Sequence, residues 1–194
     1  DCDGHRSGVH CDDREQLFAI AHTLNATGNL RGVLTHAGES YTATSRNALV
    51  AAAENERASA VSAAEILRQA GYGCPVVSIG STPTALFAEN YDGITEVRAG
   101  VFAFFDLVQA GLGVCSPHDI AVSVLATVIG HQREKGWTII DAGWTALSSD
   151  RGTESQRVDH GYGLVCDLEG NLLDGLFVTN ANQEHGIIAR REDF

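Results

Sequence analysis

Val76-Val77-Ser78-Ile79-Gly80-Ser81-Thr82-Pro83-Thr84 is an apolar strand pattern that ends in a turn of small, hydroxyl-bearing residues. A second stretch, Glu96-Val97-Arg98-Ala99-Gly100-Val101-Phe102, has the same form. The two strands are close enough in sequence to be neighbours in a parallel sheet. Their turns would then present hydroxyls and main-chain N–H groups at one point, which is how proteins hold a phosphate. We therefore predict a phosphate site at these strand ends.

The composition limits the function classes. The chain has 194 residues, of which 44% are apolar, so one large domain or somewhat more can bury a core. A net charge of −12 without basic patches argues against nucleic acid as a partner. No apolar run reaches membrane-spanning length. The five cysteines form no CxxC pair, which favours reduced thiols and a cytoplasmic location.

Two features of the composition favour a fragment of a longer protein. The sequence contains no methionine, so Asp1 is not a natural translation start. Asp1-Cys2-Asp3-Gly4 also has the pattern of a strand end whose beginning is missing. We therefore expect that further sequence precedes Asp1.

Strand and helix patterns alternate through the first half of the chain. Helical spacing of apolar residues predicts helices over 12–26 and 45–70, and a short helix follows Ser81. Buried-strand patterns cover 31–36, 74–79 and 94–98. This alternation predicts parallel βα units, so the fold class is α/β.

The pattern changes after about residue 105. The run 120–130 is apolar and β-branched, and shorter apolar runs bounded by turns follow at 137–143, 163–167 and 176–179. These features predict an antiparallel β region. We place two domains at 1–105 and 106–194, with the boundary near 105–118, where Gly111, Gly113 and Pro117 occur.

Three further polar side chains follow predicted strand ends. Arg6 lies after the first, His36 ends the second, and Tyr41 is in the loop that follows. In a βα barrel, functional groups gather at the C-terminal ends of the strands. An arginine, an imidazole, a phenol and the phosphate-binding turns are thus expected at one rim.

These motifs carry a resemblance to a known family. The chain resembles the fold-type III pyridoxal-phosphate (PLP) enzymes, which are alanine racemase-like, and more narrowly the D-threonine aldolase and D-serine dehydratase group. The matching stretches occur in family order and cover nearly the whole chain. They are 3–9, 36–41, 80–84, 95–100, 141–143, 148–152, 161–163 and 183–186.

The resemblance implies a fold and a set of roles. The fold would be the C-terminal part of a (β/α)8 TIM-type barrel, followed by part of an antiparallel β domain. Arg6 would bond the phenolic oxygen of PLP, His36 would lie against the pyridine ring, and Tyr41 would contact cofactor or substrate. Arg98 resembles an arginine that addresses the pyridine nitrogen. The phosphate would be held at Gly80, Ser81, Thr82, Gly100 and Val101.

The resemblance also implies an activity. PLP would act as an electron sink at Cα, and a divalent metal, Zn²⁺ or Mn²⁺, would hold the β-hydroxyl of a D-amino acid. Aldol cleavage of D-threonine-like substrates is the first expectation and D-serine dehydration the alternative, since Leu34 stands where some dehydratases carry a tyrosine. An amino-acid racemase and a non-catalytic PLP carrier remain open. Family members commonly pair as homodimers.

The chain departs from the family at the groups that perform the chemistry. A Schiff-base lysine is required, yet Lys135 is the single lysine and lies in a charged turn. We expect the lysine upstream of Asp1 and the metal ligands beyond Phe194, so no metal ligand is assigned here.

Simpler interpretations exist for each residue. His36 could be a core histidine, Arg6 a surface arginine, and Ser81 and Thr82 a helix cap. His185 is a polar turn residue or lies near the active site, and the sequence does not decide between these.

Overall fold

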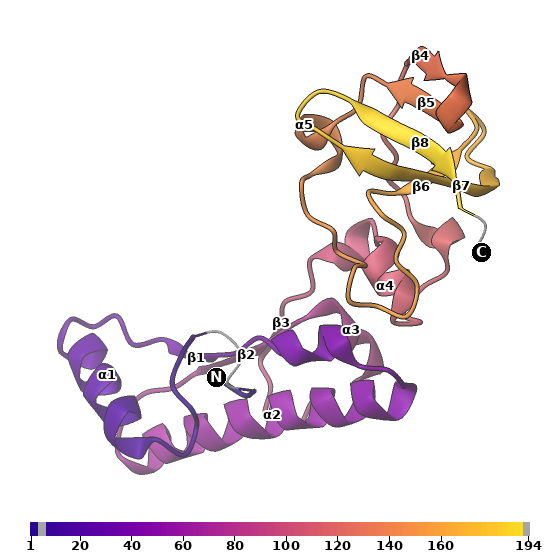
Figure 1. Cartoon of the computed structure of the whole chain (residues 1–194). Coiled ribbons are helices and arrows are strands. Elements are labelled where there is room, and N and C mark those ends of the chain that lie inside the picture. The colour runs from indigo at the N-terminus through magenta and orange to yellow at the C-terminus, as the bar shows by residue number, and fades with distance from the viewer. Residues whose placement is uncertain (4–6, 192–194) are drawn as a thin grey trace. The chain divides into compact units, whose positions relative to one another are not determined.

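The chain forms two compact units in a computed structural model that describes residues 1–3 and 7–191 (Figure 1). The first unit comprises Asp1–Ala103 with Leu112–Val114. The second comprises Phe104–Gly111 and the chain from Cys115 onward.

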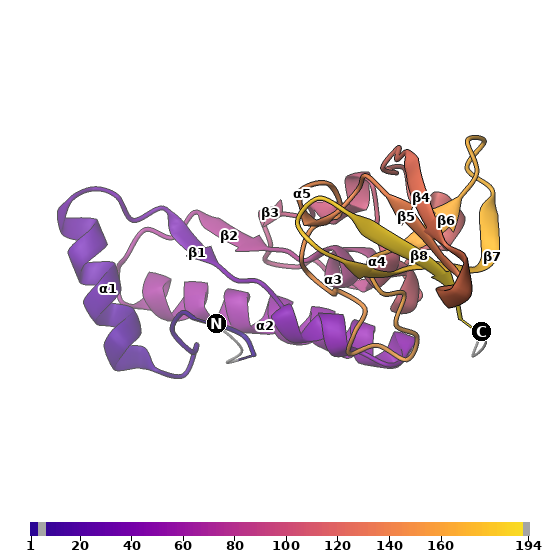
Figure 2. The ribbon, with the colours of Figure 1, turned by 45° about the horizontal axis from the view of Figure 1, so that its top comes forward.

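The first unit is built on a small parallel sheet. Strands β1 (Gly32–Leu34), β2 (Val76–Ile79) and β3 (Glu96–Val97) pair in that order. Helices α1 (Arg14–Ala26) and α2 (Arg46–Gln69) supply the packing layer, and α2 runs along the sheet (Figure 2). The predicted parallel βα arrangement is confirmed. Three strands do not close a barrel, so the barrel remains a prediction.

The sequence explains α2 well. The Ser45 side chain accepts the Ala48 N–H at 3.2 Å and caps the helix. Helix α2 then buries one stripe of residues at intervals of three or four. This stripe, together with α1 and β2, forms the core of the unit, whose fully buried members are Ala21, Ala60, Ala64, Leu67, Cys74, Val77 and Ile79.

Short helical turns follow the strands of the first unit. The 3₁₀ turn η1 (Gly38–Thr42) follows β1, α3 (Thr82–Phe87) follows β2, and η2 (Val101–Ala103) follows β3. Ser81 caps α3 by accepting the Thr84 N–H, and Pro83 lies in its first turn, as the sequence predicts.

The second unit contains a five-stranded antiparallel sheet. Its order is β4-β5-β8-β7-β6, and Ile140, Ala142 and Val178 form its buried core. The strands are β4 (Val128–Gln132), β5 (Trp137–Ile140), β6 (Leu164–Cys166), β7 (Leu172–Ala181) and β8 (Gly186–Arg190). Smaller elements are α4 (Leu107–Gly111), η3 (Pro117–Asp119), η4 (Arg133–Lys135) and α5 (Trp144–Leu147). The predicted antiparallel region is confirmed.

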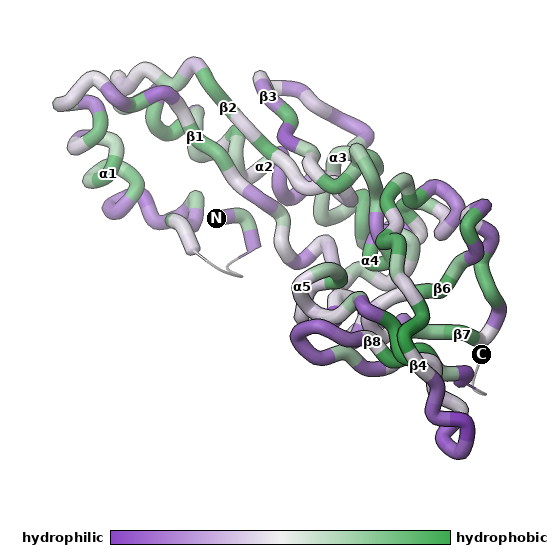
Figure 3. Tube along the Cα trace, turned by 90° about the horizontal axis from the view of Figure 1, so that it is seen from above, coloured by the Kyte–Doolittle hydropathy of each residue, from purple (hydrophilic) through white to green (hydrophobic). Residues whose placement is uncertain are grey.

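Two details of the second unit differ from the sequence prediction. The run 120–130 is not one strand, because ladder pairing begins only where Val128 meets Ile140. Leu125 in the unpaired part is 84% exposed. Strand β8 was not predicted. Figure 3 shows the hydrophilic turn between β4 and β5 in purple.

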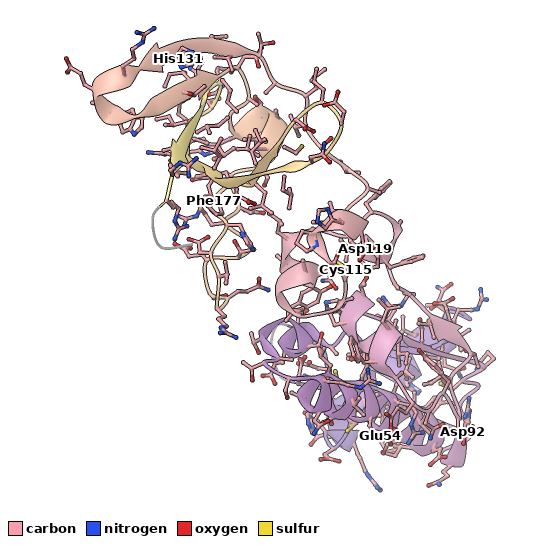
Figure 4. The ribbon with its side chains drawn as sticks, turned by 90° about the vertical axis from the view of Figure 1, so that its right-hand side faces the viewer. Glu54, Asp92, Cys115, Asp119, His131 and Phe177 are labelled. Atoms are coloured by element: carbon pink, nitrogen blue, oxygen red, sulfur yellow. The ribbon has the colours of Figure 1, made fainter. Side chains whose placement is uncertain are left out.

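Arg57 links two segments on the surface of the first unit. In Figure 4, Glu54 and Asp92 lie on the same side of the first unit. Arg57 joins them by donating to the Glu54 carboxylate and, at 3.0 Å, to the Asp92 carbonyl oxygen. All five cysteines are free thiols. Among the described residues, no helix is long and apolar enough to cross a membrane.

Candidate cofactor site

Three loops meet at one edge of the parallel sheet, because the C-terminal ends of parallel strands lie on the same side. Thr35 and His36 follow β1, Gly80 follows β2, and Arg98 follows β3. The Thr35 N–H donates to the Ser78 carbonyl at 3.0 Å, and the Arg98 N–H donates to Ile79 at 2.8 Å. The strand ends that carry His36, Gly80 and Arg98 are therefore side by side.

His36 is oriented across two strand ends. Its Nδ1 lies 2.7 Å from the Gly80 carbonyl oxygen, so Nδ1 carries the proton and Nε2 faces elsewhere. The Tyr41 ring is 6.1 Å from the imidazole, centroid to centroid. Both side chains line a pocket of about 620 Å³. That pocket is not lined by Ser81, Thr82 or Gly100.

The turn after β2 is rich in hydroxyl contacts. Ser81 Oγ lies 2.8 Å from Thr84 Oγ1 and 3.2 Å from Ser40 Oγ. Thr82 Oγ1 accepts the Phe102 N–H at 3.2 Å, which joins this turn to the one after β3. Ser81 and Thr82 are buried. Hydrogen bonds within this turn, and contacts to Ser40 and Phe102 in the neighbouring turns, therefore hold the turn in place.

Two glycines have different roles in these turns. A Cβ on Gly80 would lie 1.9 Å from the Arg98 carbonyl oxygen, so only glycine lets the two turns approach. A Cβ on Gly100 would meet nothing within 4 Å. Among the described residues, no main-chain hydrogen bond takes the N–H of Gly100 or Val101. Free N–H groups beside open space suit an anionic group such as a phosphate.

Arg98 lies across the strand ends. Its guanidinium donates to Ser78 Oγ at 2.8 Å and to the Thr35 carbonyl oxygen. Ser78 Oγ in turn donates to Glu96 at 2.5 Å. The guanidinium group of Arg98 thus donates its hydrogen bonds to acceptors within the protein.

Glu56 is a member of this site that sequence reasoning missed. It lies on α2 and is fully buried. Its Oε1 accepts the N–H of Ala37 at 3.1 Å and of Gly80 at 2.9 Å, and its Oε2 accepts the Thr84 hydroxyl at 2.6 Å. The sequence does contain one indication that Glu56 is buried. Glu56 falls on the buried stripe of α2, between Ala53 and Ala60.

Other predicted residues belong to the second unit or fall outside the described residues. Arg6 falls outside the described residues. His185 is exposed in the turn between β7 and β8, where its N–H donates to Asn182 Oδ1 at 3.0 Å. Lys135 belongs to the second unit, with its Nζ 4.5 Å from the Trp137 ring centroid. Pro117-His118-Asp119, near the predicted domain boundary, forms a 3₁₀ turn that Ser116 caps.

A polar cluster in the second unit surrounds Asp159. This carboxylate accepts hydrogen bonds from the Gly161 N–H at 2.9 Å, from Thr153 Oγ1 at 3.2 Å, and from Arg151. Burial acts to raise the Asp159 pKa, but these donors outweigh it and lower the pKa. Burial lowers the pKa of neighbouring His160.

The described part of the chain contains one group of side chains that could hold a metal ion. This group consists of His10, Cys11 and Asp12, whose ligand atoms lie within 4.8 Å of one another. These residues are consecutive and largely exposed to solvent, which is common without a metal.

The comparisons match both units to known families. Residues 1–108 match the alanine racemase N-terminal domain. The chain belongs to the fold-type III pyridoxal-phosphate family. Residues 121–194 match a second family model, described as "Putative serine dehydratase domain".

Individual relatives are dehydratases. The D-threo-3-hydroxyaspartate dehydratase of Delftia sp. (strain HT23) is 62% identical over 193 residues, which is 99% of this chain and 51% of that protein. Its structure superposes with a TM-score of 0.94 at 61% identity, covering 98% of this chain and 51% of the other, and a variant of it has been solved in a metal-free form. The D-serine dehydratase of Dictyostelium discoideum is 32% identical, over 85% of this chain and 45% of that protein.

An aldolase shares the fold only. The D-threonine aldolase of Filomicrobium marinum has a TM-score of 0.70 at 18% identity, covering 98% of this chain and 48% of that one. The fold-type III chain spans about half the length of the curated relatives it matches.

Proposed function

We propose that this protein is a PLP- and divalent-metal-dependent lyase that dehydrates D-configured β-hydroxy amino acids, with D-threo-3-hydroxyaspartate as the preferred type of substrate. The observation that carries the proposal is the 62% identity to a D-threo-3-hydroxyaspartate dehydratase across 99% of this chain. The match of the second unit to a serine dehydratase domain points the same way.

The residues at the sheet edge fit the cofactor. The open N–H groups of Gly100 and Val101, with the Thr82 hydroxyl beside them, would hold the phosphate. His36 would lie against the pyridine ring, with Tyr41 beside it. Arg6 would address the phenolic oxygen.

The reaction is an elimination followed by hydrolysis. PLP, when bound, supplies the electron sink that stabilises negative charge at Cα, and the metal supplies a Lewis acid for the β-hydroxyl. Water leaves across Cα–Cβ, the product tautomerises to an imine, and a water molecule releases ammonia and a 2-oxo acid. This chain's residues bind and orient, while the lysine and metal ligands are expected outside it.

The first expectation from the sequence, aldol cleavage, is not supported specifically. The aldolase comparison at 18% identity shows the fold alone. A racemase is disfavoured because the second unit matches a dehydratase domain. Dehydration is therefore the activity that we propose.

The test is a product assay on the whole protein with D-threo-3-hydroxyaspartate, D-serine and D-threonine. We expect ammonia and a 2-oxo acid in equal amounts, fastest with D-threo-3-hydroxyaspartate. Chelation of the metal or removal of PLP should abolish the activity, and adding each back should restore it. Formation of glycine and an aldehyde from D-threonine as the main reaction would instead identify an aldolase.

A further inference from the structure

Buried Glu56 takes two donors away from the candidate phosphate site. Its Oε1 holds the Gly80 N–H at 2.9 Å, and its Oε2 holds the Thr84 hydroxyl at 2.6 Å. Glu56 lies on α2, far in sequence from the turn that it holds. Glu56 is fully buried, and its carboxylate accepts hydrogen bonds from three protein donors. These hydrogen bonds compensate for the burial of the carboxylate and fix the positions of the groups that donate them.

The direction of the hydroxyl hydrogen bonds follows from counting protons. A hydroxyl has one proton to donate. Thr84 gives its proton to Glu56, so in the 2.8 Å contact between Thr84 Oγ1 and Ser81 Oγ the proton must come from Ser81. Ser40 gives its proton to the Ala37 carbonyl oxygen at 2.7 Å. Ser81 is therefore left with lone pairs, one of which accepts the Thr84 N–H at 3.3 Å.

Thr82 is in the opposite situation. Its Oγ1 accepts the Phe102 N–H at 3.2 Å. Among the described residues, no acceptor takes the Thr82 hydroxyl proton. This hydroxyl can therefore donate to an anion, whereas that of Ser81 cannot without breaking its bond to Thr84.

We propose that Glu56 is a positioning residue of the cofactor site: through Thr84 it turns the Ser81 hydroxyl away from the phosphate and leaves Thr82 as the hydroxyl donor. Ser81 then serves as the cap of α3. This inference rests on the proposed use of PLP, and it corrects the expectation that both hydroxyls hold the phosphate.

The test compares PLP with pyridoxal, which lacks the phosphate, as ligands of the apo form of the whole protein. The readout is the ratio of the pyridoxal Kd to the PLP Kd. General damage to the fold weakens both ligands alike and leaves this ratio unchanged. The ratio therefore isolates the phosphate contacts.

Thr82→Val should lower the ratio by about tenfold, the effect of losing one hydrogen bond to a charged group. Thr82→Ser should restore it. Ser81→Ala should lower the melting temperature through loss of the cap but leave the ratio within about twofold. A tenfold fall for Ser81→Ala with no fall for Thr82→Val would overturn the proposal.

Glu56→Gln should raise the ratio by about threefold or more. The amide would keep both main-chain N–H groups on Oε1 but donate to Thr84, so the Thr84 proton turns to Ser81 and the Ser81 hydroxyl is released toward the phosphate. Removal of a buried negative charge favours the phosphate as well. Thr84→Val, which leaves residue 56 intact, should also raise the ratio.

Glu65→Gln is the matched control, because Glu65 is exposed on the same helix. It should change neither Kd. An unchanged or lowered ratio for both Glu56→Gln and Thr84→Val contradicts the role of Glu56. Failure of the wild-type protein to bind PLP or to release ammonia contradicts the proposed function instead, so the two failures are distinguishable.

Discussion

His36 shows how a single side chain is placed by its neighbours' main chain. The 2.7 Å contact from Nδ1 to the Gly80 carbonyl fixes the ring plane, and the proton on Nδ1 follows from the acceptor. The sequence indicates His36 by its place at a strand end, but not this partner, which is 44 residues away.

His36 variants should separate the ring from its hydrogen bond. If the imidazole lies against the cofactor, His36→Phe in the whole protein keeps a flat ring and should weaken PLP binding by about threefold. His36→Ala loses both contributions and should weaken it by about tenfold or more. Titration of the apo form measures both. Equal affinities for wild type and His36→Ala would show that the imidazole only packs in the core.

His160 should make stability depend on pH. Burial lowers its pKa below the usual 6.5, with Arg191 acting in the same direction and Asp159 opposing it. The unfolded chain therefore binds more protons than the folded one just below pH 6.5, so the free energy of unfolding falls as the pH drops through this region. The loss levels off once the folded form is also protonated.

Chemical denaturation between pH 7.5 and 5 measures this effect. His160→Gln should flatten the curve over that interval, and His131→Gln, at an exposed site, is the control. A wild-type curve that rises toward acid would contradict the expected direction.

At the scale of elements, local pattern predicts what local interactions build. Helix α2 follows from Ser45 and an apolar stripe, and β2 from its unbroken apolar run. Residues 120–127 do not form a strand, because the hydrogen-bonded ladder with β5 begins only at Val128. The periodicity of a sequence does not show which segments pair with each other. The sequence does not predict strand β8, because its short run Gly186–Arg190 is defined by its pairing with β5 and β7, which local pattern does not reveal.

Gly80 should be irreplaceable because of the close approach between the turns after β2 and β3. Gly80→Ala would place a Cβ 1.9 Å from the Arg98 carbonyl oxygen, so the backbone must shift, at a cost of about 3 kcal/mol in stability. Gly73→Ala, where a Cβ meets nothing within 4 Å, should leave the melting temperature within a few degrees of wild type. Equal melting temperatures for the two variants would refute the argument.

At the scale of the whole molecule, the sequence indicates the fold class and the family, and the structure adds how the site residues are joined. The phosphate turns could be recognised because glycine and hydroxyl residues at strand ends have a direct chemical meaning. Glu56 could not, because a glutamate in a helix is ordinarily a solvated residue and only the assembled turns reveal its partners.

A dimer is the expected assembly of the whole protein, as the family resemblance implies. Light scattering should give twice the protomer mass at micromolar concentration, and activity should fall with the dimer fraction on dilution if the partner contributes to the site. A fully active monomer would contradict this expectation.

The contacts of Glu56 also restrict how this lineage can change length. Each residue advances an α-helix by about 100°, so inserting or deleting one residue between Ser45 and Glu56 would carry the carboxylate round to solvent. The Ala37 and Gly80 amides would then lose their shared acceptor. We expect the spacing from the Ser45 cap to this glutamate to be invariant among relatives that keep both turns.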